Sequence, residues 1–332
     1  MEQNLFFGKK WTDLLVLLLF GVVLLFGGMF IPLLGTVAVF LWCLPVVFAV
    51  YRYGIGSGVF LGALFALLGV AAVGVPAAMF SVGCMSVLGL VYGIAFRKKY
   101  APGKILVLGT VLVVAFGALN FFLAYTLEGV SLGEMCRGFE EELAAVYNVY
   151  VESGNLDTIL IEGMGAEAYF AELIKEIMQM LPSFFFLAAL VIAAANYLIA
   201  QFVLKKQSAD IRSLPPFTEW HLPWWVLWGV VAALIFYVGG NFFDSEILLA
   251  TAKNILICSA PVFLVAGISL VRYFFVKWNV SAGIQVGFWI FVFLFFSVAM
   301  MFFVLMGAGD AAVDYRANVM KKKNNDVGGH EK

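Results

Sequence analysis

Long apolar runs separated by short polar breaks fill the chain from residue 11 to residue 307. The hydrocarbon core of a bilayer is about 30 Å thick, so a spanning helix needs about 20 apolar residues. Nine runs meet or approach this length: 11–31, 33–51, 55–75, 78–96, 105–126, 182–204, 223–240, 247–274 and 283–307. The pattern predicts an all-α, polytopic transmembrane helical bundle of about nine spans, with eight or ten as alternatives.

Positive charges between the runs predict the orientation, because loops rich in Lys and Arg stay in the cytoplasm. Basic residues at 9–10, 52, 97–104, 205–212 and 272–277 all fall on one side if the N-terminus is cytoplasmic. We therefore expect a multi-pass protein of the bacterial inner (cytoplasmic) membrane. Nine full spans would place Arg316 and Lys321 outside, so either one late run is re-entrant or split, or the tail is an exception.

Composition excludes other classes of protein. Hydrophobic residues make up 64 % of the chain, charged residues 12 %, and the mean hydropathy is +1.01. Soluble domains carry about 25 % charged residues, so the expected partner of most of the surface is the lipid bilayer. A net charge of −1 provides no broad basic surface for nucleic acid.

The runs divide the chain into four parts. Residues 1–206 form a membrane core, which includes an acidic extracytoplasmic helical insertion at 128–180. An interfacial elbow at 207–222, further transmembrane helices at 223–308 and a polar tail at 309–332 follow. Within the insertion, apolar residues at helical spacing predict two amphipathic helices, at 139–150 and 166–180. The insertion is either a solvated helical hairpin or a lid over the outer mouth.

Small residues and the elbow provide two candidate partner contacts. Gly58 and Gly62 form a stripe that lets helices approach closely, either within the chain or against another membrane subunit. In the elbow, three prolines forbid a continuous helix. The elbow either aims the next span at the membrane surface or presents Phe217 and Trp220 to a partner, with Arg316 nearby in that second interpretation.

Polar groups at membrane depth are candidate ligand contacts, because an unpaired polar group in hydrocarbon is costly. Asn120, Asn196 and Asn254 either bond neighbouring helices or bind a ligand. Lys253 either extends to the membrane surface or binds a ligand, and Trp42 is a candidate apolar wall.

Motifs of catalysis are missing from the sequence. It contains no P-loop, no His-Glu-x-x-His and no Gly-x-Ser-x-Gly. Four scattered cysteines and two histidines do not form a metal-ligand pattern. We expect no enzyme activity, no metal and no cofactor.

Several short motifs resemble one family. They are Tyr51-Arg-Tyr-Gly-Ile-Gly-Ser-Gly58, Leu214-Pro-Pro-Phe-x-x-Trp220-x-x-Pro223, Asn254 followed by Gly267, and Gly307-x-Gly-Asp310-x-x-x-Asp-Tyr-Arg316. In this order they resemble the YybS-like family of bacterial membrane proteins, known as domain of unknown function 2232. The first six spans are also similar in pattern to the substrate-binding S subunits of energy-coupling-factor vitamin transporters.

Two alternative functions follow, the first from the similarity to S subunits and the second from the elbow and the residues around Arg316. The first is a small-molecule-binding or transport subunit without an ATPase of its own, with its ligand between the outer halves of the third to sixth spans. The second is a membrane scaffold or regulator that acts through protein contacts.

Overall fold

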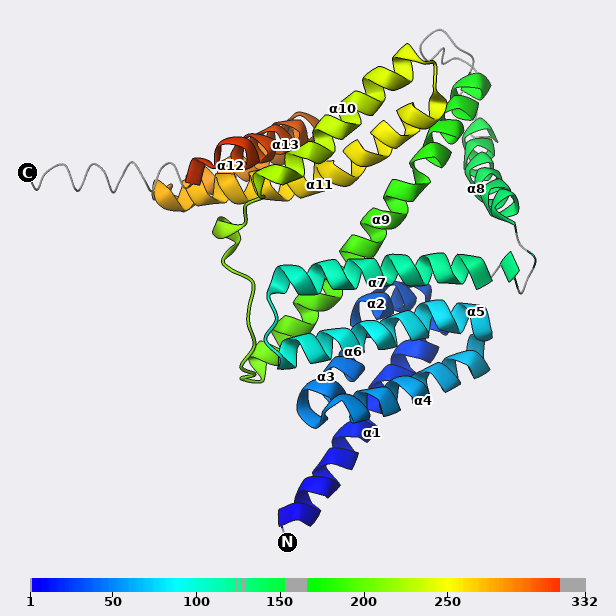
Figure 1. Cartoon of the computed structure of the whole chain (residues 1–332), viewed down its shortest axis with the longest axis vertical. Helices are drawn as coiled ribbons and strands as arrows, with labels where there is room; N and C mark the ends of the chain where they lie inside the picture. The colour runs from blue at the N-terminus through cyan, green and yellow to red at the C-terminus, as the bar shows by residue number, and fades with distance from the viewer. Residues whose placement is uncertain (1, 124, 127–128, 130, 153–165, 317–332) are drawn as a thin grey trace, which may run out of the picture. The chain divides into compact units, whose positions relative to one another are not determined.

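The structure is a computed structural model of residues 1–332, and it describes all of them except 1, 124, 127–128, 130, 153–165 and 317–332 (Figure 1). The described residues fold into helices joined by short turns. They cluster into two compact units. The N-terminal unit comprises Met1–Met178 and Phe185–Leu214, and the C-terminal unit comprises Gln179–Phe184 and Pro215–Lys332.

Helices of the N-terminal unit begin and end at proline and glycine. Pro32 starts α2, Gly54 (φ 93°) joins α3 to α4, and Gly74 (φ 80°) ends α4. Proline suits a first helical position because its missing N–H would be unpaired there, and glycine reaches positive φ without strain. The helices are α1 (Glu2–Phe30), α2 (Pro32–Leu41), α3 (Leu44–Tyr53), α4 (Ile55–Val73), α5 (Val75–Ala78), α6 (Cys84–Arg97), α7 (Pro102–Leu123), α8 (Leu132–Glu152) and α9 (Ala166–Lys206).

Close packing at glycine holds α3, α4 and α6 together. A Cβ on Gly58 would lie 2.1 Å from a Val50 methyl carbon, and one on Gly62 would lie 3.3 Å from the Ser86 Cβ. Both glycines are buried. The stripe therefore packs helices of this chain against one another, and these two residues do not offer a surface to a partner.

The acidic insertion differs from its prediction in its second half. The first amphipathic helix is the longer α8, whose N-terminus is capped by reciprocal bonds between Ser131 and Glu134. Those bonds lower the pKa of the Glu134 carboxyl. The second helix is not separate: it continues into the sixth span as the 41-residue α9, with Pro182 inside it. Residues 153–165, which link the two, lie outside the described residues.

Asn254 explains how α9 passes through Pro182. An ideal helix would bond the Ser183 N–H to the Gln179 carbonyl. Here the Ser183 N–H donates to the Asn254 Oδ1 (2.9 Å), while the Asn254 Nδ2 donates to the Gln179 carbonyl (2.7 Å). One side-chain amide thus satisfies both groups beside the proline. Neighbouring side chains are what make proline tolerable in a membrane helix.

The C-terminal unit begins with the elbow, which contains two 3₁₀ turns, Phe217–Glu219 and Trp224–Val226. Four helices follow: α10 (Leu227–Phe242), α11 (Glu246–Lys277), α12 (Ala282–Leu294) and α13 (Phe296–Val313). Figure 1 shows α10, α11 and α13 running alongside one another, and the contacts agree.

The ninth apolar run is not one span. It breaks at Phe295 (φ −109°, ψ 41°) into α12 and α13. Phe288 and Phe303, on either side of the break, pack with ring centroids 6.3 Å apart, so the chain folds back on itself. A 13-residue helix extends only about 20 Å and cannot cross the hydrocarbon core alone. From the sequence pattern, a split late run is one of two explanations for the basic residues of the C-terminal tail, and the structure shows that split.

Two glycines bring the backbones of α11 and α13 into contact. A Cβ on Gly267 would lie 1.9 Å from the Phe303 carbonyl oxygen, and one on Gly307 would lie 2.0 Å from the Phe263 carbonyl oxygen. In lipid there is little hydrophobic driving force between helices, and small residues at a helix crossing favour association because they allow close van der Waals contact. These glycines belong to the motifs that carried the family resemblance.

Eight of the described helical segments are long and apolar enough to cross a membrane, and two shorter apolar helices, Ser81–Arg97 and Ala282–Leu294, accompany them. This confirms an all-α polytopic bundle of about nine spans.

We expect Asn254→Leu to lower the free energy of unfolding by about 2 kcal/mol, because it leaves the Ser183 N–H and the Gln179 carbonyl unpaired. Thermal unfolding of the purified protein measures it. Pro182→Ala allows α9 to form the helical bond between the Ser183 N–H and the Gln179 carbonyl. In that background, Asn254→Leu should therefore lower the free energy of unfolding by less. Equal costs in both backgrounds would contradict this role of Asn254.

Gly267→Ala should destabilise the protein by about 2 kcal/mol, since α11 and α13 must separate to admit the methyl group. Gly287→Ala on α12 is the matched control, because nothing lies within 4 Å of a Cβ there. Chemical denaturation compares the two variants. A Gly267→Ala protein as stable as Gly287→Ala would show that the helices do not approach so closely.

Candidate functional site

Four buried side-chain atoms of the N-terminal unit have no hydrogen-bond partner among the described residues. They are Trp42 Nε1, Ser86 Oγ, Asn120 Oδ1 and Asn196 Oδ1. Trp42, Ser86 and Asn196 are each more than nine-tenths buried. Most buried polar atoms in proteins have a hydrogen-bond partner, and one that lacks a partner costs about 1–3 kcal/mol of stability. In this unit, the described residues thus leave four buried polar atoms without a hydrogen-bond partner.

Asn196 is half satisfied. Its Nδ2 donates to the Val39 carbonyl (3.0 Å) on α2 and to the Ile192 carbonyl (2.9 Å) on α9 itself. These bonds join the two helices and fix the plane of the amide. The Oδ1 is thereby held in place as an acceptor, and none of the described residues donates to it.

Trp42, Ser86 and Asn196 lie at similar depth in the unit. They stand ten or eleven residues from the basic helix ends Arg52, Arg97 and Lys206, respectively, which corresponds to about 15 Å of helix. The Asn196–Val39 bond links α9 to α2 near Trp42. A Cβ on Gly89, one turn beyond Ser86, would lie 2.8 Å from the Cys43 carbonyl oxygen. The segment around Trp42 and the helices α6 and α9 thus contact one another at the depth of Trp42, Ser86 and Asn196.

Asn120 belongs to a different neighbourhood. It lies on α7, sixteen residues beyond Lys104, or about 24 Å along the helix. One turn earlier, Gly117 packs against Phe185 of α9. Asn120 is therefore nearer the opposite end of the unit from the basic residues.

Asn254 and Lys253, predicted as ligand contacts, lie in the C-terminal unit on α11. The bonds to α9 employ both ends of the Asn254 amide, and its Nδ2 also lies 2.8 Å from the Ala250 carbonyl. Asn254 is therefore a structural residue. Lys253 is half-buried beside it.

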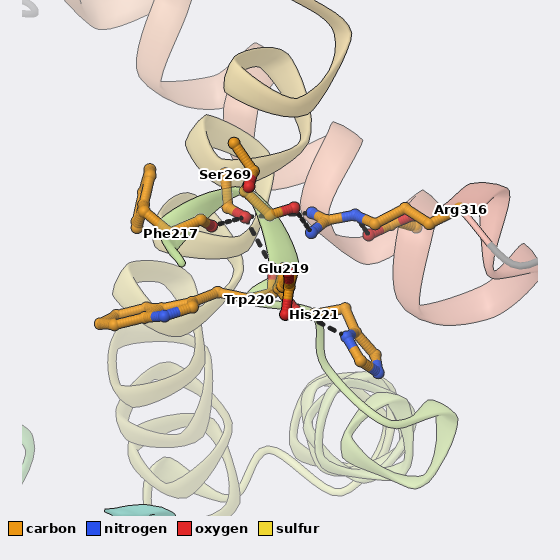
Figure 2. Close-up of polar contacts among 8 residues, drawn as sticks. Phe217, Glu219, Trp220, His221, Ser269 and Arg316 are labelled. Atoms are coloured by element: carbon orange, nitrogen blue, oxygen red, sulfur yellow. Dashed lines mark hydrogen bonds and ion pairs between the residues drawn. The ribbon is translucent and has the colours of Figure 1, made fainter. Parts of the chain in front are cut away.

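A second polar cluster fixes the elbow to the C-terminal unit, and Figure 2 shows how it is built around Arg316. The Arg316 Nη1 donates to the Thr218 carbonyl (2.6 Å), and its Nη2 donates to the Ser269 Oγ (3.2 Å). The Ser269 hydroxyl lies 2.6 Å from the Phe217 carbonyl and 2.8 Å from the Trp220 carbonyl. Side chains thus bond the carbonyls of Phe217, Thr218 and Trp220, and the Phe217 carbonyl also accepts the Trp220 N–H (3.2 Å).

Arg316 forms a buried ion pair with Asp310. Its Nε lies 3.3 Å from the Asp310 Oδ2, and the two side chains are only 6 % and 2 % exposed. The guanidinium carbon also lies 5.6 Å from the centre of the Tyr273 ring, within cation–π range. The charge of Arg316 is therefore paired inside the unit. The sequence pattern had instead placed Arg316 among the residues that could contact a partner.

Aromatic side chains cover the outer face of the elbow. The Phe217 and Trp220 rings pack at 5.3 Å, and Phe217, Trp224 and Trp225 are exposed. Tryptophan prefers the interface between water and lipid. The buried cluster around Arg316 thus holds an aromatic surface at a fixed position.

Sequence reasoning missed Ser86 and Ser269. Both are small polar residues in apolar spans, and the available signal was that a serine in such a span must bond to something. In Ser269 the partner is a carbonyl of the elbow, which is distant in sequence.

Removing either member of the buried pair, as in Arg316→Leu or Asp310→Leu, should cost about 3 kcal/mol, because the other charge stays buried without its partner. The double variant should cost less than the sum of the two. Hydrogen exchange at residues 217–220 should accelerate in Arg316→Leu and stay unchanged in Arg272→Leu, an exposed arginine of α11. Unchanged exchange in Arg316→Leu would show that the elbow does not depend on this pair.

Comparison with known proteins supplies the family. Residues 19–311 match the family described as predicted membrane protein, domain of unknown function 2232. The uncharacterized protein YybS of Bacillus subtilis (strain 168) is 24 % identical over 202 residues, which is 58 % of this chain and 61 % of that relative. The chain thus matches less than two thirds of that relative's length, and no solved structure matches. Because the family match extends from α1 to α13, this chain belongs to the YybS-like family of predicted membrane proteins, domain of unknown function 2232.

Proposed function

We propose that the N-terminal unit binds a small neutral molecule inside the membrane, as a non-enzymatic binding or transport subunit whose energy source is another protein. The observation that carries this proposal is the set of partnerless polar atoms at Trp42, Ser86, Asn120 and Asn196. They include a donor, the indole N–H, and two amide acceptors, and the serine hydroxyl can act as either. A ligand with both donors and acceptors would satisfy the atoms of Trp42, Ser86 and Asn196, and Asn120 would bind it nearer the opposite end of the unit.

The chemistry of these residues favours an uncharged ligand. None of the four side chains is ionisable, and a charged molecule without a counter-charge is expensive to bury in hydrocarbon. Planar heterocycles with amide-like edges, such as nucleobases and many vitamins, have this pattern of donors and acceptors. This class agrees with the similarity to vitamin-binding S subunits that the sequence pattern of the first six spans suggests, which is an argument by analogy of fold.

The orientation belongs to the same proposal. The basic residues at 52, 97–104 and 205–212 would face the cytoplasm of a bacterial cell, with α8 on the outer side. Asn120, farther from the basic end, would then be nearest the outer surface, where a ligand enters. Partner subunits would supply ATP hydrolysis, since the sequence has no P-loop.

A scaffold function is the second candidate, and the elbow favours it. Its aromatic face is fixed before any partner arrives, which lowers the entropy cost of binding. Under this function, replacing Phe217 and Trp224 with alanine would abolish binding of a partner protein and leave small-molecule binding unchanged.

Thermal unfolding of the detergent-purified protein against a panel of nucleobases and vitamins tests the first proposal. A ligand at a hundred times its dissociation constant should stabilise the protein by about 2.7 kcal/mol. Trp42→Phe and Asn120→Leu should weaken that stabilisation at least tenfold in apparent affinity. The control is Asn241→Leu, an exposed asparagine of α10.

Trp42→Phe also separates a ligand from an enclosed water. Without a ligand, it should raise the stability of the protein, because it removes a buried donor that has no partner. A protein that is folded, responds to no member of a broad panel and loses stability in Trp42→Phe would contradict the binding proposal and support buried water at this position.

A further inference from the structure

An amphipathic groove lies at the basic end of the N-terminal unit, and the proposed ligand contacts do not line it. It encloses about 370 Å³ between α1, α3 and the end of α9. One end is polar, formed by Asp13, Arg52, Tyr53 and Gln207. The remaining wall is apolar, with Phe20, Phe48 and Val203 among its side chains. Its volume is in the range of small-molecule sites.

Arg52 is the cation of this groove and retains binding capacity. Its Nη1 donates to the Asp13 Oδ2 (3.3 Å) and its Nη2 donates to the Gln207 Oε1 (2.5 Å). The Tyr53 hydroxyl also donates to Asp13. Two bonds engage two of the five N–H donors of a guanidinium, and 44 % of the Arg52 side chain is exposed. The network orients the guanidinium and leaves it open to another acceptor.

The surroundings of the groove are strongly positive. Lys10 lines a second hollow that shares Tyr53 with the groove. Lys99 forms an ion pair with Asp210, and a Cβ on Gly54 would lie 3.0 Å from an Arg97 nitrogen, so the basic helix ends are close together. Among the residues whose side chains the structure describes, nine basic residues belong to this end of the unit, against Asp13 and Asp210: Lys10, Arg52, Arg97, Lys98, Lys99, Lys104, Lys205, Lys206 and Arg212. This charge complements an anion.

The apolar wall decides between a soluble anion and a lipid. Arg52 lies at the end of the span Leu33–Tyr53, where headgroups lie, while Phe20 lies ten residues inside the span Lys10–Gly28. Val16 and Phe20 are both exposed along that wall. An acyl chain would cover them, whereas a free phosphate would leave them as they are.

We propose that this groove binds one anionic phospholipid, with its phosphate on Arg52 and one acyl chain along the apolar wall of α1 and α3. Arginine binds phosphate oxygens through charge-assisted bonds, often two at once. The site is independent of the ligand proposed for the N-terminal unit, because it requires neither Trp42 nor Asn120.

The test uses full-length protein in a mild detergent, with native mass spectrometry to count bound lipids and thermal unfolding to measure the effect. Dioleoylphosphatidylglycerol should bind at least tenfold more tightly than dioleoylphosphatidylcholine, which has the same acyl chains. Arg52→Gln should abolish this preference, and Arg52→Lys should retain part of it. Lys98→Gln, at the same end but outside the groove, should change the affinity by less than twofold.

Val16→Trp provides a second measurement, because it fills the groove without altering a charge and remains informative if Arg52→Gln fails to fold. It should weaken phosphatidylglycerol binding at least tenfold. Glycerol 3-phosphate tests the headgroup alone and should not stabilise the protein. The proposal is overturned by equal binding of the two lipids, by equal losses in Lys98→Gln and Arg52→Gln, by tight binding in Val16→Trp, or by stabilisation with glycerol 3-phosphate.

Discussion

Satisfaction of backbone hydrogen bonds in hydrocarbon is the constraint on which this structure depends. No water in the hydrocarbon core can bond a free N–H or carbonyl, and the helices of this chain meet that constraint by bonding their backbone groups within each segment. At two interruptions of the helix a side chain compensates: Asn254 beside Pro182, and Ser269 with Arg316 at the elbow. At these two breaks, polar side chains replace the missing helical bonds.

The same constraint separates structural polar groups from candidate functional ones. Both ends of the Asn254 amide are bonded inside the chain, whereas Asn196 uses its nitrogen and its oxygen has no donor among the residues that the structure describes. Trp42 and Asn120 also have an unused buried atom. All of these residues are polar groups in apolar spans, so only their bonding distinguishes them.

Much of the family resemblance converges on the C-terminal unit. Gly267 and Gly307 allow α11 and α13 to touch, and Asp310 and Arg316 hold the segment that contains Phe217 and Trp220. These motifs have a clear structural purpose, which is to fix the elbow on the helices. Arg316 lies beside Tyr273, and Tyr273 is one helical turn before Lys277 on α11. The positive charge of Arg316 therefore lies at the same end of α11 as Lys277.

The apolar pattern was enough to predict the class of fold, because a run of apolar residues long enough to cross a bilayer has few alternative structures. Pro32 and Gly54 ended helices as expected, since their backbone preferences are local. Side-chain packing was needed to show that α9 continues through Pro182, that the last run folds back at Phe295, and that Asn120 and Asn196 each have an acceptor with no donor among the described residues. Each of these depends on a partner distant in the chain: whether a proline breaks a helix, or a polar atom is satisfied, is determined by what packs against it.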